Sequence, residues 1–140
     1  MAATQRYRAQ HAELVALTNQ ITALWNDGNF GSSATEVRNL VSDLAGKLSI
    51  HLAMEDKRLY PILMAHADPD VRALAGRYSD EMGTLADDFA QFNRRWLTAG
   101  LIEKAPKEFI ADAKRVLAAL AMRIEKENGE LFKLLDGLEG

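Results

Sequence analysis

The sequence predicts an all-α protein, an up-down-up-down antiparallel four-helix bundle. Apolar residues recur at steps of three and four along almost the whole chain, which is the period of an amphipathic helix. No stretch alternates as a half-buried strand does, and short polar turns separate the helical stretches, as in a bundle of antiparallel neighbours. The 140 residues contain no internal linker or repeat, so we expect a single domain over residues 1–140.

The first two helices are predicted from their apolar stripes and from the signals between them. A turn cluster at residues 26–29 ends the first helix. Ser33 and Glu36 have the spacing of a capping box, so the second helix should begin there and run to about Ala65, with Pro61 kinking its last turns. The first stripe consists of Tyr7, His11, Leu14, Thr18, Ile21 and Trp25. The second consists of Val37, Val41, Leu44, Leu48, His51, Glu55, Leu59 and Ile62.

The last two helices have clear signals at their first residues. Asp68 is expected to cap the third helix, with Pro69 in its first turn and Gly100 as its stop. Pro106 opens the fourth helix, and Gly137 closes it. The third stripe consists of Leu74, Tyr78, Met82, Leu85, Phe89, Phe92 and Trp96. The fourth consists of Phe109, Ala113, Val116, Leu120, Arg123, Glu127, Leu131 and Leu134.

Composition and charge narrow the range of functions. The net charge is −3 with the two signs mixed along the chain, which gives no basic surface for nucleic acid. The chain has no cysteine, so disulfides, thiolate zinc sites and iron–sulfur clusters are excluded. No apolar run is long enough for a membrane span, and the N-terminus lacks the apolar core of a signal peptide. We therefore expect a cytoplasmic protein without nucleic-acid or membrane partners.

Several polar side chains interrupt the apolar stripes, and they should meet. His51 and Glu55 are four residues apart and share the helix face that points into the core. Burying a glutamate is costly unless the group is paired or bound to a metal. Counting residues from each turn places one layer of residues, drawn from all four helices, at a similar height in the bundle. That layer contains His11, His51, Glu55, Met82, Arg123 and Glu127.

This arrangement resembles the hemerythrin-like, or HHE cation-binding, family. The resemblance rests on His11 in the first helix, on the His51–Glu55 pair that leads into residues 59–61, and on Arg123 and Glu127 before Leu131-Phe132. It covers nearly the whole chain. It implies a bundle whose core holds two irons bridged by carboxylates, in a family whose members bind dioxygen or sense oxygen or iron.

Two departures from the family pattern bear on the metal. By resemblance, His11 and His51 stand where the ligands of one iron stand, and Glu55 and Glu127 where the bridging carboxylates stand. Met82 and Arg123 stand where the histidines of the other iron would be. Thioether sulfur is a poor partner for iron, and a guanidinium cannot ligate a metal. We therefore expect neither a di-iron centre nor reversible dioxygen carriage.

Two functions remain open for this core. The first is a non-enzymatic regulatory or interaction module whose histidines, glutamates and Arg123 form a metal-free polar network. The charge balance favours this network, because the charges of two carboxylates, one guanidinium and one imidazolium sum to zero. The alternative is a sensor or weak redox protein that holds one iron, zinc or manganese ion through His11, His51, Glu55 and Glu127. Haem bound by a histidine and Met82 is disfavoured by the charged layer.

Catalysis and partners are weakly indicated. No nucleophile–base pair and no phosphate-binding loop is recognisable, so we expect no enzymatic activity, although a single metal ion could support hydrolytic or redox chemistry. A protein partner or a homodimer could use the fourth helix, where apolar residues recur every seven positions. The alternative is that these residues only widen the core-facing stripe. They are Ile110, Leu117, Ile124 and Leu131.

Overall fold

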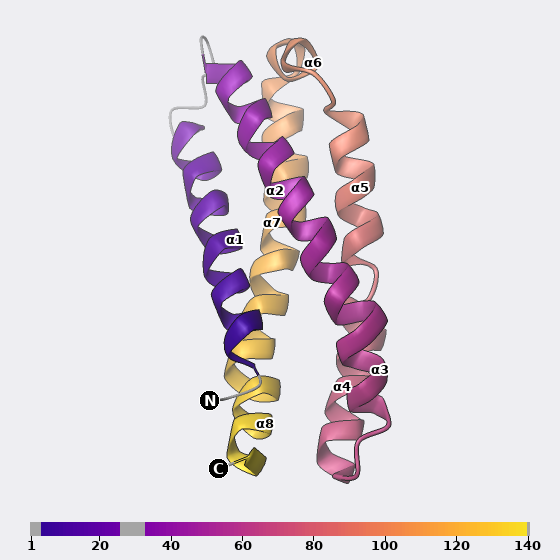
Figure 1. Ribbon diagram of the computed structural model, residues 1–140. Helices are drawn as coiled ribbons and strands as arrows, with labels where there is room; N and C mark the ends of the chain where they lie inside the picture. The colour runs from indigo at the N-terminus through magenta and orange to yellow at the C-terminus, as the bar shows by residue number, and fades with distance from the viewer. Residues whose placement is uncertain (1–3, 26–32, 140) are drawn as a thin grey trace.

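The computed structural model describes residues 4–25 and 33–139, so the predicted turn at residues 26–29 lies outside the described residues. Within these ranges the secondary structure is helical throughout and contains no strand (Figure 1). None of the described helices has the length and apolarity needed to cross a membrane. The α-helices are α1 (Gln5–Leu24), α2 (Ala34–Met54), α3 (Tyr60–Met64), α4 (Pro69–Met82), α5 (Leu85–Arg95), α6 (Ala99–Lys104), α7 (Pro106–Lys126) and α8 (Phe132–Glu139). Two π-helical turns are η2 (Glu55–Leu59) and η3 (Glu127–Leu131).

The helices surround an elongated core. The long helix α1 packs against α2 and α7, and α5 packs against the same two helices from another side. The short helix α6 covers one end of the bundle and contacts α2 and α7 (Figure 1). At the other end, α3 packs against α4, and the first turns of α1 lie beside α8, where Arg8 donates to Asp136 at 3.1 Å (Figure 1).

The apolar core consists of two clusters. The larger cluster joins α1, α2, α5, α6 and α7, and Leu52 and Ile124 are the members nearest to the π-helical turns along their helices. The smaller cluster joins α3, α4 and the segment from η3 into α8. The members of the smaller cluster are Tyr60, Leu63, Val71, Ala75, Tyr78, Leu131 and Phe132. The polar layer predicted from the sequence lies between the two clusters.

Some helix boundaries match the predicted signals and others do not. Asp68 caps α4 as expected, because its side chain accepts hydrogen bonds from two amides of the first turn at 2.8 and 3.1 Å. Ser33 precedes α2 but makes no capping hydrogen bond through its side chain. The predicted third helix is interrupted after Met82, where α4 ends and α5 follows. Gly100 and Gly137 end no helix, since each lies inside one.

The π-helical turn η2 changes which residues face the core. The stripe predicted from the sequence continued from Glu55 to Leu59 and Ile62, but Ile62 is 65% exposed. The buried residues are instead Tyr60 and Leu63, one position further along the chain. In the π turn the amide of Tyr60 bonds the carbonyl of Glu55, five residues back, which adds one residue to the turn. The side chains that follow the π turn therefore point in directions rotated about the helix axis, relative to those of an uninterrupted α-helix.

The second π-helical turn, η3, acts in the same way on the last helix. The amide of Phe132 bonds the carbonyl of Glu127, and Phe132 is fully buried, which the sequence did not predict. The apolar residues at seven-residue spacing also belong to this helix. Leu117, Ile124 and Leu131 are buried in the bundle and Ile110 is half-buried, which favours the wider core stripe. A partner for this helix stays a prediction.

Candidate metal centre

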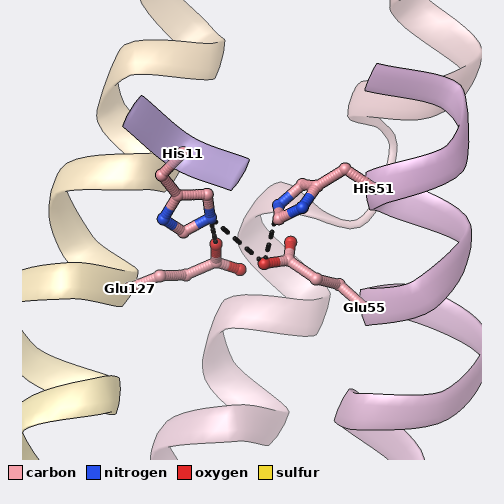
Figure 2. Close-up of side chains that lie close together, drawn as sticks. All are labelled: His11, His51, Glu55 and Glu127. Atoms are coloured by element: carbon pink, nitrogen blue, oxygen red, sulfur yellow. Dashed lines mark hydrogen bonds and ion pairs between the residues drawn. The ribbon is translucent and has the colours of Figure 1, made fainter. Parts of the chain in front are cut away.

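Four buried side chains from four elements point toward one another in the middle of the bundle (Figure 2). His11 comes from α1 and His51 from the last turn of α2. Glu55 and Glu127 are the first residues of the two π-helical turns. All four side chains are at most 3% exposed. The structure thus brings together the four residues that the sequence singled out as candidate ligands.

The donor atoms of this cluster lie close enough together to hold a metal ion. Nε2 of His11 lies 3.2 Å from Oε2 of Glu55 and 3.1 Å from Oε1 of Glu127. Nε2 of His51 lies 2.9 Å from the same oxygen of Glu55. One donor atom from each residue lies within 4.8 Å of the other three. At metal–ligand distances of about 2.1 Å, neighbouring ligand atoms are about 3.0 to 3.4 Å apart, so contacts of 2.9 to 3.2 Å are compatible with a shared ion as well as with hydrogen bonds.

Two amide side chains orient the imidazole rings. Nδ1 of His11 donates to Oδ1 of Asn128 at 2.8 Å, and Nδ1 of His51 donates to Oε1 of Gln10 at 2.6 Å. An amide oxygen can only accept, so the proton of each neutral ring is on Nδ1. Each Nε2 then presents its lone pair to the glutamates, as hydrogen-bonded histidine ligands do in metal sites.

Arg123 occupies the opposite side of both glutamates. Its Nη2 donates to Oε1 of Glu55 at 3.0 Å, and its Nε donates to Oε2 of Glu127 at 3.2 Å. Each glutamate therefore gives one oxygen to the histidine side and the other to the guanidinium. The guanidinium is 2% exposed and bridges the two carboxylates as a second cation would.

Two further acceptors complete the hydrogen bonds of Arg123. Nη2 donates to Oδ1 of Asp56 at 2.6 Å, and Nη1 donates to the main-chain carbonyl of Met82 at 3.1 Å. Met82 is the last residue of α4, so its carbonyl is one of those left free at a helix C-terminus, where a positive charge is also favoured by the helix dipole. Met82 joins the polar layer through its main chain, whereas we had expected its side chain there.

Tyr60 completes the wall beside Arg123. Its hydroxyl donates to Oε2 of Glu127 at 2.7 Å, and its ring lies 5.5 Å from the guanidinium carbon of Arg123. Burial and the charge of Glu127 raise the pKa of Tyr60, so the phenol remains a neutral donor. The sequence marked Tyr60 only as a core aromatic residue. Its hydrogen bond follows from the π turn, which rotates Tyr60 into the place expected for Leu59.

The charges of the cluster perturb its titration. Burial alone would lower the pKa of His11, but its contacts with Glu127, Glu55 and Asn128 raise the pKa to about 9. Burial alone would raise the pKa of Glu55, but His11, His51 and Arg123 hold it below its usual value. Burial raises the pKa of Glu127, the contact with His11 opposes this, and the charge of Glu55 adds to it. A cation placed between the two glutamates would relieve that repulsion.

Two atoms of the cluster lack a hydrogen-bond partner within the described part of the chain and are free to bind a cation. Among the described residues, Nε2 of His51 and Oε1 of Glu127 have no hydrogen-bond partner, although each lies close to another atom of the cluster. An imidazole lone pair facing a carboxylate oxygen is unfavourable unless a proton or a metal ion lies between them. The four residues could therefore hold a metal ion through two nitrogen and two oxygen atoms.

Asp56 changes the charge balance that the sequence suggested. With Asp56 counted, three carboxylates face one guanidinium, which leaves two formal negative charges beside the histidines. One divalent ion and two neutral imidazoles would balance these charges, and so would two imidazolium rings without metal. We missed Asp56 because the α-helical period puts it on a different face from Glu55. Gln10 and Asn128 had one signal, since each adjoins a candidate ligand in the sequence.

Residues 2–135 match the family model for the hemerythrin HHE cation-binding domain. No curated protein matches the chain, and no solved structure does. The match covers nearly all of the sequence, including every residue of the cluster described above. The chain belongs to the hemerythrin HHE cation-binding domain family.

Proposed function

We propose that this protein binds one divalent metal ion and that Arg123 takes the place of a second ion. His11, His51, Glu55 and Glu127 would hold the metal. The observation that carries this proposal is the division of the glutamate oxygens, one to the histidines and one to the guanidinium. Because the guanidinium of Arg123 is permanently positive, it would repel a second metal ion on its side of the glutamates. We therefore propose that di-iron chemistry and dioxygen carriage are lost.

The consequence of binding is a change in stability rather than a chemical reaction. When bound, iron or manganese would supply a redox-active centre, and zinc a redox-inert cross-link. The chain's own residues orient the donor atoms and exclude water from them. An ion at one hundred times its dissociation constant stabilises a fold by about 2.7 kcal/mol. A link between α1, α2 and the last helix would thus let the protein report metal availability, as a regulatory module and not as an enzyme.

The metal-free polar network is the second candidate. It is favoured by the raised pKa of His11, because an imidazolium can stand where the ion would be. In that case the same residues would be a structural core, and the regulatory role would depend on a partner.

We also propose that the chain runs up-down-up-down, as α1, then α2 to α3, then α4 to α5, then α7 to α8. The contacts of α1 and α5 with both α2 and α7 support this path.

Metal analysis separates the two candidates. The protein is produced in medium replete with iron, zinc and manganese, purified without chelator, and compared with His51→Ala and His66→Ala. His66 is the matched control, because its Nδ1 only accepts the amide of Asp68 at 3.0 Å. We expect about one ion per chain in the original protein and in His66→Ala, and affinity weakened by at least tenfold in His51→Ala. Two ions per chain would refute the role of Arg123, and none would favour the metal-free network.

A further inference from the structure

A buried centre needs a route for its ion. The four candidate ligands are at most 3% exposed. A cavity of about 140 Å³ lies between α1 and α2 and has one of them, His51, in its wall. Three other cavities contain none of the four. The residues that line the first cavity are Gln10, Glu13, Leu14, Lys47, Ile50 and His51.

The outer part of this cavity opens at the surface of the bundle. Ile50 is 65% exposed, and the side chains of Lys47 and Glu13 are 53% and 66% exposed. Nζ of Lys47 lies 3.6 Å from Oε2 of Glu13, which makes a solvated ion pair of low strength. A volume of about 140 Å³ accommodates several water molecules, at about 30 Å³ each in the liquid. A partly hydrated ion therefore fits between the surface and the inner wall.

The inner wall of the cavity contains two side chains that are bonded to each other, Gln10 and His51. His51 faces Glu55 through Nε2, and its Nδ1 is bonded to Gln10. Nε2 of Gln10 makes only a long contact of 3.7 Å with the sulfur of Met54. Gln10 is half-buried, whereas the ring of His51 is 3% exposed and packs edge-on against the rings of Tyr7 and His11. His51 is thus the candidate ligand in the cavity wall, and its hydrogen bond to Gln10 is the contact that an entering ion would have to displace.

The opposite side of the centre is closed to cations. There the guanidinium of Arg123 is held by Glu55, Glu127, Asp56 and the carbonyl of Met82. A divalent ion that approached from that side would meet a fixed positive charge in a poorly solvated region. On the α1–α2 side the exposed charges of Glu13 and Lys47 nearly cancel.

We propose that divalent cations reach and leave the centre through the cavity between α1 and α2, with Gln10 and His51 as its gate. This inference rests on the proposed function, since it assigns the route to the same centre. A residue that narrows a route raises the barrier to entering and to leaving by the same amount. Both rate constants then fall together while the dissociation constant stays the same.

The route is tested by zinc exchange kinetics with Ile50→Trp. Binding of Zn²⁺ alone and its release to a fluorescent chelator are followed by stopped flow. Ile62→Trp is the matched control, because Ile62 is also 65% exposed but lines none of the cavities described here. We expect Ile50→Trp to slow association and dissociation by the same factor, tenfold or more, with unchanged affinity. Ile62→Trp should exchange at the original rates.

The outcomes separate the route from the metal site itself. If the original protein binds zinc and Ile50→Trp exchanges as fast as it does, the route is refuted and the proposed function stands. A change in affinity without a matching change in both rates also refutes the route. If the original protein binds no zinc, iron or manganese, the proposed function fails and the route with it. Circular dichroism of each variant verifies that the added indole leaves the helices intact.

Discussion

Replacing Arg123 with methionine should destabilise the metal-free protein and tighten its hold on a divalent ion. The guanidinium is 2% exposed and donates to Glu55 and Glu127, whose side chains are fully buried. Methionine keeps most of the volume but leaves both carboxylates without this partner. Breaking a buried ion pair by removing one member costs about 3–5 kcal/mol. For a chain of this length that corresponds to a fall of about 9–15 °C in Tm, at roughly 3 °C per kcal/mol.

The effect on metal affinity has the opposite sign. Without the guanidinium, the same carboxylates face the ion with one more uncompensated negative charge. We expect the affinity for Zn²⁺ or Mn²⁺ to rise by at least tenfold, which corresponds to about 1.4 kcal/mol. Excess metal should therefore recover much of the stability lost by Arg123→Met.

The assay is urea unfolding with and without metal, combined with competition against a chelator. Arg115→Met is the matched control on the same helix, because Arg115 is 74% exposed and its nearest carboxylate contact, to Asp112, is 3.7 Å. It should change the free energy of unfolding by less than about 1 kcal/mol. Arg123→Met with unchanged metal-free stability would show that the guanidinium does not hold the glutamates. Weaker metal binding would show that it does not stand in for a cation.

Two further predictions concern single protons of the centre. Tyr60→Phe removes the donor at 2.7 Å from Glu127 and should lower the free energy of unfolding by about 1.5–3 kcal/mol in urea titrations; equal stability would mean that this hydrogen bond is not formed. The pKa of His11 is about 9 in the folded protein and 6.5 in the unfolded chain. Its contribution to the stability of the metal-free protein is therefore complete below pH 6.5 and is lost as the pH rises to 9. Unfolding at several pH values should show this decline, while zinc affinity rises over the same range; stability that is flat from pH 6.5 to 9 would contradict it.

The sequence predicted the helices and the composition of the polar layer well, for a physical reason. Helical period and residue spacing are local properties, so His11, His51, Glu55, Arg123 and Glu127 could be placed on core-facing stripes before any coordinates. Their heights followed from the rise per residue, which is constant along a helix. The structure brings all five together in one buried cluster.

The errors along the core-facing stripes come from the π-helical turns, whereas the break after Met82 and the positions of Gly100 and Gly137 inside helices are separate errors. A π turn depends on a single additional residue, which a period of 3.6 cannot reveal. Beyond Glu55 the stripe moved from Leu59 to Tyr60, so a hydrogen-bond donor was taken for simple core packing. Asp56 was missed because the helical period places it on a different face from Glu55. The role of Met82 could not be predicted either, because it depends on a main-chain carbonyl left free by the break after α4.

The division of the apolar core into two clusters has a consequence for how the molecule opens. The smaller cluster has seven buried members and is connected to the rest of the molecule through a layer of charges. A unit of that size is expected to open more readily than the larger cluster. Amide hydrogens of α3, α4 and α8 would then exchange with solvent faster than those of the central helices, and a bound ion would slow them. The strength of the interactions in the charged layer would thus set how long this end of the bundle stays closed.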